Sequence, residues 1–320
     1  MKQYRIAVLG GSGFVGSHLL SRLTKEGHSL TVLTRRRERH RHLLVLPSTN
    51  VIEADIHNPQ HLQRYLAQHD IVINLVGILN EQGDTGQGFH RAHVVLTEKI
   101  ITACRQHGIK RLLHMSALHA AADAPSHYLR SKGQAEHFVL DQDDMHVTCF
   151  RPSVIFGPGD SFFTRFAKLL RLTLGPFPLA CANARFAPIY VGDVVSAFCQ
   201  SIHLPQTYGQ AYDLCGPKTY TLFELVTFTA QVIGKKRWIM PLGNFTSALQ
   251  ANLLEYFPGK PFSRDNYRSM KIDSVCGQAW PDIFKLERAT IEAIVPEYLT
   301  PQRSRDRYMD IRQHSHHQDS

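Results

Sequence analysis

The sequence Arg5-Ile-Ala-Val-Leu-Gly10-Gly-Ser-Gly13-Phe-Val-Gly16-Ser-His-Leu-Leu20 decides the fold of this chain. The apolar run at residues 6–9 is typical of a buried parallel strand. Glycines spaced three apart follow it, and apolar residues then recur every four positions, as they do on one face of a helix. This arrangement brings bare backbone N–H groups, at the positive end of the helix dipole, close to a pyrophosphate.

We therefore predict a dinucleotide site at this turn. Glycine permits the tight backbone angles and the close approach. The flanking strand and helix supply the context that a lone glycine triplet lacks. A glycine-rich turn without a ligand is the alternative. The predicted contacts are Gly10, Gly13, Phe14, Val15 and Gly16.

Further strand–helix alternations follow along the first half of the chain. Strands are expected at residues 30–33, 51–54, 71–76, 112–115 and 147–150, and helices at 60–68, 93–107 and 131–140. This alternation predicts an α/β fold, a doubly wound parallel Rossmann sheet with helices on both faces. Ligands of such sheets bind at the carboxyl ends of the strands.

The second half of the chain is punctuated by Pro and Gly and becomes more helical. Residues 1–155 are expected to form the dinucleotide-binding domain, and residues from about 186 to 214 to return to its sheet. Residues 156–185 and 215–300 then form a smaller, mostly helical C-terminal lobe. The polar tail at 301–320 is expected to be disordered, and no metal site is expected in its histidines.

Composition limits the class of protein. The 320 residues are 43% hydrophobic, which is typical of a globular chain, and no apolar run is long enough for a transmembrane helix. The first strand leaves no room for a signal peptide. The six cysteines lack C-x-x-C spacing, so we expect reduced, mostly buried thiols, no zinc site and a cytoplasmic location.

The formal net charge of +9 fits phosphorylated ligands, an anionic membrane surface or nucleic acid. Nucleic acid is not expected, because no aromatic residues are interleaved with the basic ones. Arg35 and Arg36 follow the second strand, where a dinucleotide site that prefers NAD carries an acidic residue. A guanidinium there suits a 2′-phosphate, so we predict NADP(H) in preference to NAD(H). Two solvated arginines are the alternative.

A possible chemical centre lies in Tyr128-Leu-Arg-Ser-Lys132, a Y-x-x-x-K sequence between the fifth and sixth strands. At i and i+4 on a helix the two side chains share a face. The lysine ammonium is expected to lower the pKa of the phenol, which then exchanges a proton with a substrate oxygen while hydride moves at the nicotinamide.

Together, the G-x-x-G-x-x-G turn and Y-x-x-x-K resemble the extended and atypical branches of the short-chain dehydrogenase/reductase superfamily. The resemblance implies that Lys132 also binds the ribose and that the other cofactor contacts are Asp55, Ile56, Val76, Gly77, Arg151 and Pro152. It also implies a Ser or Thr hydroxyl near the end of the fifth strand that binds the substrate oxygen, and Ser116 stands there. Extended members often have a pair of hydroxyl residues at this place, of which the second is catalytic, and in this chain the second position is Ala117. This departure puts turnover in doubt.

Segments 128–136, 175–179, 188–194 and 263–267 resemble one subgroup, the atypical family of the NADPH-binding accessory subunit of respiratory complex I and its bacterial relatives. The resemblance implies NADPH binding with a structural role, and partners among respiratory-complex or quinone-biosynthesis proteins. A catalytic NAD(P)-dependent oxidoreductase or epimerase/dehydratase stays open as the alternative.

Segment 238–261 carries an apolar helical stripe, with a basic flank formed by Lys235, Lys236, Arg237 and Lys260. We expect this stripe in the core of the small lobe, as helical apolar stripes usually are. The alternatives are a peripheral place on a membrane surface, such as the inner membrane, and a contact with a quinone-linked complex.

Overall fold

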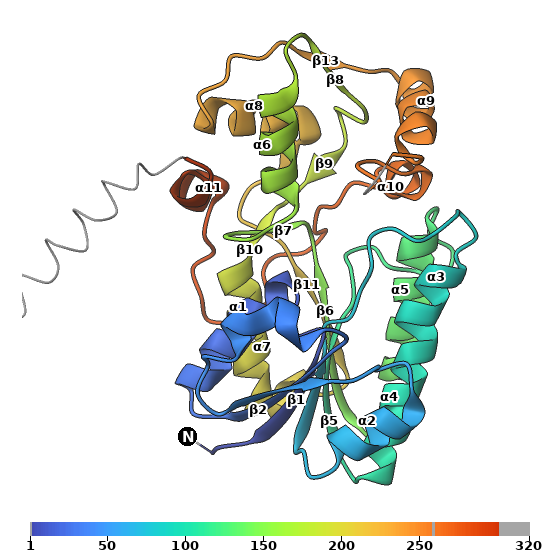
Figure 1. The fold of residues 1–320 in the computed structure, drawn as a ribbon, viewed down its shortest axis with the longest axis vertical. Helices are drawn as coiled ribbons and strands as arrows, with labels where there is room; N and C mark the ends of the chain where they lie inside the picture. The colour runs from blue at the N-terminus through green and yellow to red at the C-terminus, as the bar shows by residue number, and fades with distance from the viewer. Residues whose placement is uncertain (1, 258–259, 301–320) are drawn as a thin grey trace, which may run out of the picture.

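Seven parallel strands form the main sheet of the computed structural model, which describes residues 2–257 and 260–300. The strand order is β11-β6-β5-β4-β1-β2-β3 (Figure 1). Successive strands are added on one side of β1 up to β3 and on its other side from β4 onward, so the strand order switches between β1 and β4. The strands are β1 (Arg5–Leu9), β2 (Ser29–Thr34), β3 (Thr49–Glu53), β4 (Ile71–Asn74), β5 (Arg111–Met115), β6 (His146–Pro152) and β11 (Gln210–Leu214). This is the predicted doubly wound Rossmann sheet.

Helices cover both faces of the sheet because successive strand residues point to opposite faces. In β1, Ile6 and Val8 pack toward one face, and Ala7 and Leu9 toward the other. The first face holds α1 (Phe14–Lys25) and α7 (Val191–Ile202). The second holds α2 (Pro59–Leu66), α4 (Leu96–Gln106) and α5 (His127–Leu140) (Figure 1). Shorter pieces are η1 (Arg37–Leu43), α3 (Gln87–His90), the π-helical turn η2 (Arg91–Val95) and η3 (Pro205–Thr207).

The small lobe has its own apolar core, formed around Phe156, Phe163, Leu225 and Val295. Its helices are α6 (Phe162–Leu172), α8 (Leu222–Val232), α9 (Asn244–Leu254), α10 (Arg264–Ser269) and α11 (Ile291–Leu299). Its short strand pairs are β7 (Ile155–Phe156) with β10 (Ile189–Tyr190), β9 (Arg185–Phe186) with β12 (Tyr220–Thr221), and β8 (Phe177–Leu179) with β13 (Ile239–Pro241). The predicted mostly helical lobe is therefore present, with short strand pairs added.

Two expected elements differ from the structure. The stretch after Pro188 does not return to the main sheet as a strand, because β10 pairs with β7 and the apolar residues that follow form α7. Only β11 joins the sheet from the expected region 186–214. The last helix before β6 begins at His127 rather than at 131, so one helix carries both residues of the Y-x-x-x-K sequence.

The expectation that all six cysteines are reduced is wrong. Cys215, which follows β11, forms a disulfide with Cys276, 61 residues later. The other four cysteines are free. Sequence spacing misses this pair because the fold, and not the chain, brings the two residues together.

Most of the apolar stripe of 238–261 does not lie in the core either, although Ile239 is buried there. Trp238, Phe245 and Tyr256 are 72%, 81% and 83% exposed. No helix of residues 2–257 and 260–300 is long and apolar enough to cross a membrane. The histidine-rich tail at 301–320, expected to be disordered, lies outside the described residues.

Candidate nicotinamide dinucleotide site

Close packing around the glycine turn leaves room for no side chain at two positions. Gly10 has φ +77°, and a Cβ on it would lie 2.9 Å from the carbonyl carbon of Leu75. A Cβ on Gly16 would lie 2.5 Å from the Cα of Gly11. The first turn of α1 therefore sits directly against the chain that leaves β1, as a pyrophosphate-binding turn requires.

The N-terminus of α1 has no side-chain cap. Gly13 is the N-cap residue, and its N–H donates to the carbonyl of Gly10 at 3.0 Å. Phe14 and Val15 open the helix and pack partly against the core below it. The uncapped N–H groups of the first turn are the donors that an anion at this end of the helix would use.

The segment after β6 crosses over the start of α1. His18 Nε2 lies 2.9 Å from the carbonyl oxygen of Pro158, and a Cβ on Gly159 would contact the ring of Phe14. Asp160 fixes this segment, because its carboxylate accepts N–H groups of Gly157 and Thr164. The start of α1 is thus held between the sheet and this loop.

At the predicted adenosine end of the site, Arg35 and Arg36 follow the last residue of β2 and are both exposed. Among the described residues, neither makes an ion pair or a side-chain hydrogen bond. The nearby Glu53 carboxylate accepts the backbone N–H of Arg37 at 2.9 Å and pairs with neither arginine. Both predicted guanidinium groups are therefore available to an anionic ligand.

Beyond β3, Asp55 and Ile56 lie at the same edge of the sheet. The Asp55 carboxylate accepts the N–H of His57 at 2.9 Å and so closes a local turn. Ile56 is half-buried against the core on the α2 side. Both residues lie on the chain that leaves β3, the strand next to β2, and their contact with a cofactor stays a prediction.

The end of β4 lies against the lysine of α5. The Lys132 ammonium donates to the carbonyls of Val76 at 3.2 Å and Met115 at 2.9 Å. A Cβ on Gly77 would stand 3.3 Å from the same nitrogen. Asn74 orients this chain by accepting the N–H of Val76. Val76, Gly77 and Lys132 therefore form one surface at the carboxyl edge of the sheet.

The pKa of Tyr128 is shifted in the opposite direction from the one expected. Burial raises the pKa of Tyr128 to about 12, and burial lowers the pKa of Lys132 to about 8. The expected lowering of the phenol pKa by the ammonium is therefore wrong for this structure, because the pKa is shifted by loss of water around the phenol, which acts in the opposite direction. The Tyr128 ring packs edge-on against Phe89 and His93.

Ser116 and Ala117 follow β5. The Ser116 Oγ is buried and has no hydrogen-bond partner among the described residues. Ala117 is buried beside Ala124 and Leu129, with Tyr128 packed against that cluster. The Ala117 side chain, which has no hydroxyl, therefore lies next to Tyr128. The hydroxyl of the preceding residue, Ser116, makes no hydrogen bond with the described residues.

Arg151 and Pro152 end β6. The Arg151 guanidinium donates to the carboxylate of Glu136 on α5, and Asp213 lies 3.5 Å from it. Pro152 is buried, and its carbonyl accepts the N–H of Leu118. The Arg151 charge is therefore already paired, so any cofactor contact at this position would use the rest of the residue or require that pairing to change.

Sequence reasoning missed His93. Its Nε2 accepts the N–H of Ile78 at 3.1 Å, and its Nδ1 lies 2.8 Å from Ser131 Oγ, which donates to the carbonyl of Tyr128. Burial lowers the pKa of His93 to about 2, so the ring is neutral. The neutral ring links the chain after β4 to the helix that carries Tyr128. Its place in the π-helical turn η2 has no clear signal in the sequence.

Asp265 was also missed, although segment 263–267 was singled out. Its carboxylate accepts the backbone N–H groups of His127 at 2.7 Å and Tyr128 at 3.1 Å. The N-cap residue Ser126 accepts the N–H of Leu129. Together they satisfy three donors of the first turn of α5, and the small lobe supplies one of the two caps.

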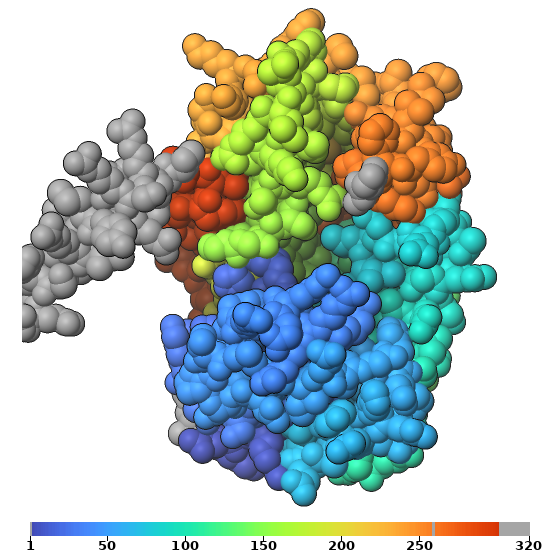
Figure 2. Space-filling view, in the orientation of Figure 1, coloured from blue at the N-terminus to red at the C-terminus, as the bar shows by residue number. Residues whose placement is uncertain are grey.

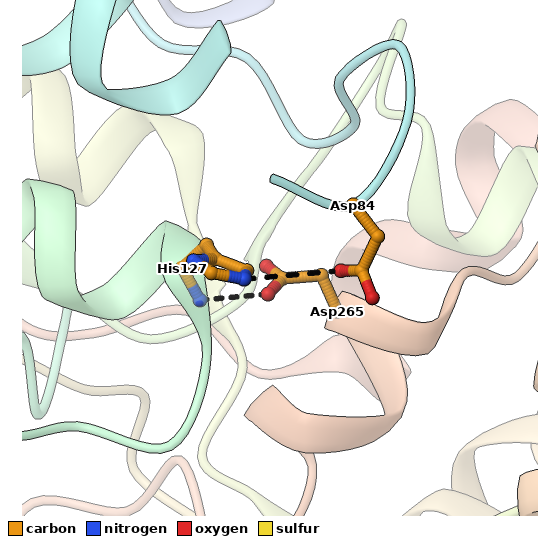
Figure 3. A group of neighbouring side chains, drawn as sticks. All are labelled: Asp84, His127 and Asp265. Carbon is orange, nitrogen blue, oxygen red and sulfur yellow. Dashed lines mark hydrogen bonds and ion pairs between the residues drawn. The ribbon is translucent and has the colours of Figure 1, made fainter. Parts of the chain in front are cut away.

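Figure 3 shows Asp84, His127 and Asp265 from three different segments. Their ligand atoms are close enough to hold a metal ion. However, the Asp84 carboxylate accepts two hydrogen bonds from Arg268, at 2.6 and 2.7 Å, and Asp265 caps α5. A cation would have to displace a guanidinium, so the group acts as a clasp between α10 and the main domain.

The predicted cofactor positions thus lie on the segments that follow β1, β2, β3 and β4, at the last two residues of β6 and, for Lys132, on α5, whose ammonium contacts the segment after β4. A family model described as the NAD dependent epimerase/dehydratase family matches residues 6–215. This chain belongs to that family. The matched region spans the sheet and every predicted site residue, from Gly10 to Pro152.

Curated proteins similar to this epimerase/dehydratase family member include respiratory subunits. A 233-residue match to the mitochondrial NADH-ubiquinone oxidoreductase 40 kDa subunit of Neurospora crassa is 26% identical and covers 72% of this chain. A match to NADH dehydrogenase [ubiquinone] 1 alpha subcomplex subunit 9 of Arabidopsis thaliana is 29% identical over 233 residues and covers 71%. The matches cover 60% and 57% of those relatives' own lengths.

Among solved structures, MoeE5 in complex with UDP-glucose and NAD has the same fold. It superposes with a TM-score of 0.63 at 22% identity, over 75% of this chain and 85% of MoeE5. At this identity the similarity shows the shared Rossmann architecture, while function depends on the residues of the site itself.

Proposed function

We propose that this chain binds a nicotinamide dinucleotide at the carboxyl edge of its sheet, with the pyrophosphate over the glycine turn. The observation that carries the proposal is the contact of α1 with that turn. A Cβ on Gly16 would come within 2.5 Å of Gly11, so the uncapped start of α1 is held where its N–H groups can meet a phosphate. Membership of an NAD-dependent family supports the same ligand.

The proposed cofactor is NADP(H) in preference to NAD(H). Arg35 and Arg36 are exposed at the end of β2, and no acidic side chain takes the position that would bind a ribose 2′-hydroxyl. A guanidinium pairs with a 2′-phosphate by charge and by its forked donors.

Calorimetric titration with NADPH and NADH tests the preference. Arg35→Ala and Arg36→Ala should weaken NADPH binding about tenfold, the effect of one lost charge-assisted hydrogen bond, and leave NADH binding unchanged. Arg39→Ala, an exposed arginine of η1, is the matched control. Equal affinity for both cofactors, unaffected by either variant, would overturn the preference.

We also propose that catalysis is weak and that cofactor binding is the main role. A bound nicotinamide supplies hydride chemistry, and in this proposal Tyr128 moves the accompanying proton. Its raised pKa keeps the proton on the phenol, and Ala117 offers no hydroxyl to a substrate oxygen. Loss of one preorganised donor costs on the order of a hundredfold in rate.

The second candidate function is an active NAD(P)-dependent oxidoreductase or epimerase/dehydratase. The observation that favours it is the unpartnered Ser116 Oγ, in the same chain turn as Ala117 and near the α5 helix of Tyr128 and Lys132. Turnover that is lost in both Tyr128→Phe and Ser116→Ala, with NADPH binding retained, would establish this function over the first.

For partners, we propose respiratory-complex or quinone-biosynthesis proteins, at the periphery of the inner membrane. The similarity to subunits of NADH-ubiquinone oxidoreductase supports this. Native electrophoresis of solubilised membranes tests it: the chain should migrate with NADH dehydrogenase activity or with a quinone-biosynthesis assembly. Migration of the whole population as a free monomer would contradict it.

A further inference from the structure

Large apolar side chains are concentrated on one end of the small lobe. Of the thirteen exposed large hydrophobic residues in the described chain, nine lie in two segments of that lobe, 172–174 and 238–257. These nine form what we call the apolar end: Leu172, Leu174, Trp238, Met240, Phe245, Leu249, Leu253, Tyr256 and Phe257. Exposed patches of this kind mark interaction sites in soluble proteins.

Helix α9 exposes its large apolar side chains and buries small ones. Phe245, Leu249 and Leu253 recur every four residues and point outward. The buried positions of the same helix are Ser247 and Ala251, which are small. A helix stabilised by its own lobe normally buries its apolar face, whereas α9 turns that face away from the described residues of its lobe.

Hydrogen bonds hold α9 in this orientation. Ser247 Oγ accepts the N–H of Cys181 at 3.1 Å, and Gln250 donates to the carbonyl of Pro178. After the helix, Glu255 is buried and pairs with Arg264 at 2.5 Å. The exposed stripe is therefore fixed by polar contacts on the opposite side.

The two segments belong to one surface region. Leu172 and Leu174 lead into β8, and Trp238 leads into β13, which pairs with β8. The chain then passes from β13 to α9, which contacts β8 through Gln250. Figures 1 and 2 show these segments, yellow-green and orange, at the end of the molecule away from the blue half of the Rossmann sheet.

The charges around the apolar end are almost all positive. Segments 165–178 and 234–257 contain six basic residues and one acidic residue, and that acid is the buried Glu255. The basic residues are Arg165, Lys168, Arg171, Lys235, Lys236 and Arg237. Lys260, expected in the same basic flank, instead donates to the carbonyl of Glu81 and so faces the main domain.

We propose that the apolar end inserts into the interface of a bilayer that contains anionic phospholipids. Exposed Trp and Tyr beside Leu and Phe suit the boundary between headgroups and acyl chains. The basic residues then lie at the level of the anionic headgroups. A second copy of this chain fits less well. A symmetric contact would bring the basic residues around two apolar ends together, with no exposed carboxylates in these segments to pair with them.

The inference deepens the membrane part of the proposed function and does not depend on cofactor binding. Failure of cofactor binding and failure of membrane binding can be told apart, because NADPH titration and vesicle flotation are separate measurements on the same full-length protein. Flotation with vesicles of phosphatidylcholine alone, and of phosphatidylcholine mixed equally with phosphatidylglycerol, is the test. The wild type should float with the mixed vesicles and remain below with the neutral ones.

Two double variants separate the apolar from the electrostatic part. Phe245→Ser/Leu253→Ser should abolish flotation, and Lys235→Glu/Lys236→Glu should weaken it at least about thirtyfold, from roughly fivefold per lysine. All four side chains are exposed, so thermal unfolding should be unchanged. The matched controls, Val45→Ser and Lys25→Glu/Lys110→Glu, alter exposed residues of the main domain and should float like the wild type.

Absence of wild-type binding to the mixed vesicles, in protein with a native unfolding transition, would overturn the proposal. Equal flotation of the α9 double variant and the wild type would overturn it as well. A wild-type dimer that the Phe245→Ser/Leu253→Ser change converts to monomer, without vesicle binding, would assign the apolar end to a second copy instead.

Discussion

The Asp265 carboxylate of the small lobe accepts the backbone N–H of Tyr128 at the start of α5, at 3.1 Å. A residue 137 positions away along the chain therefore caps the helix that carries the Y-x-x-x-K sequence. The same clasp includes the paired Arg268 and Asp84. Hydrogen bonds therefore join α10 directly to the backbone of the tyrosine.

Removal of this cap should destabilise the protein. Asp265→Ala leaves two N–H donors at the positive end of α5 without their acceptor, so we expect the free energy of unfolding to fall by about 2 kcal/mol. Denaturant unfolding measures the change. Asp282→Ala, an exposed carboxylate, is the control and should cost little. Equal stability of the two variants would show that the cap contributes nothing.

Gly16 should tolerate no side chain. In Gly16→Ala the new Cβ would press on the backbone of Gly11, so α1 must move away from the turn. We expect a loss of about 1–3 kcal/mol in stability, together with weaker NADPH binding. Gly175→Ala is the matched control, because a Cβ there meets nothing within 4 Å. A Gly16→Ala protein with wild-type stability and cofactor affinity would refute the packing argument.

The neutral state of His93 should make stability depend on pH. The native pKa of about 2 lies below the ordinary value of 6.5, so below pH 6.5 the unfolded chain binds a proton that the native chain does not. This contribution to stability is complete above pH 6.5 and is lost as pH falls toward 2. Its slope is at most about 1.4 kcal/mol per pH unit.

Unfolding free energies at pH 7 and pH 5 check this effect. His93→Gln keeps a hydrogen-bonding side chain and removes the titrating ring, so its stability should fall less between the two pH values than that of the wild type. An equal fall in unfolding free energy in both proteins would mean that His93 does not cause the pH dependence of stability.

The disulfide should contribute measurably to stability. Cys215 and Cys276 close a loop across 61 positions, and loops of that length gain about 4 kcal/mol in the chain-entropy model. Cys276→Ser should therefore lower the free energy of unfolding by about 2–4 kcal/mol. Thiol titration of the unfolded, unreduced chain should find the four free cysteines, and all six after reduction. Six reactive thiols before reduction would contradict the crosslink.

The sequence predicts the sheet and the glycine turn because both are set by neighbours along the chain. Gly16 belongs to a local motif, and the alternation of strands and helices is read over short windows. The roles of His93 and Asp265 depend on contacts across the fold, and no spacing signals them. The same holds for the disulfide between Cys215 and Cys276.

The orientation of α9 could not be predicted for a different reason. A stripe formed by Phe245, Leu249 and Leu253 has the same period whether it faces the core or the solvent. Only the contacts of Ser247 and the pairing of Glu255 decide which side is buried. Likewise, the acidity of Tyr128 depends on burial, which the Y-x-x-x-K spacing does not report.

Cofactor binding itself is measured by isothermal titration calorimetry of the wild-type chain with NADPH and with NADH. We expect saturable heat at one site per chain, with NADPH the tighter ligand. Absence of heat with both dinucleotides, from protein that unfolds cooperatively, would contradict it.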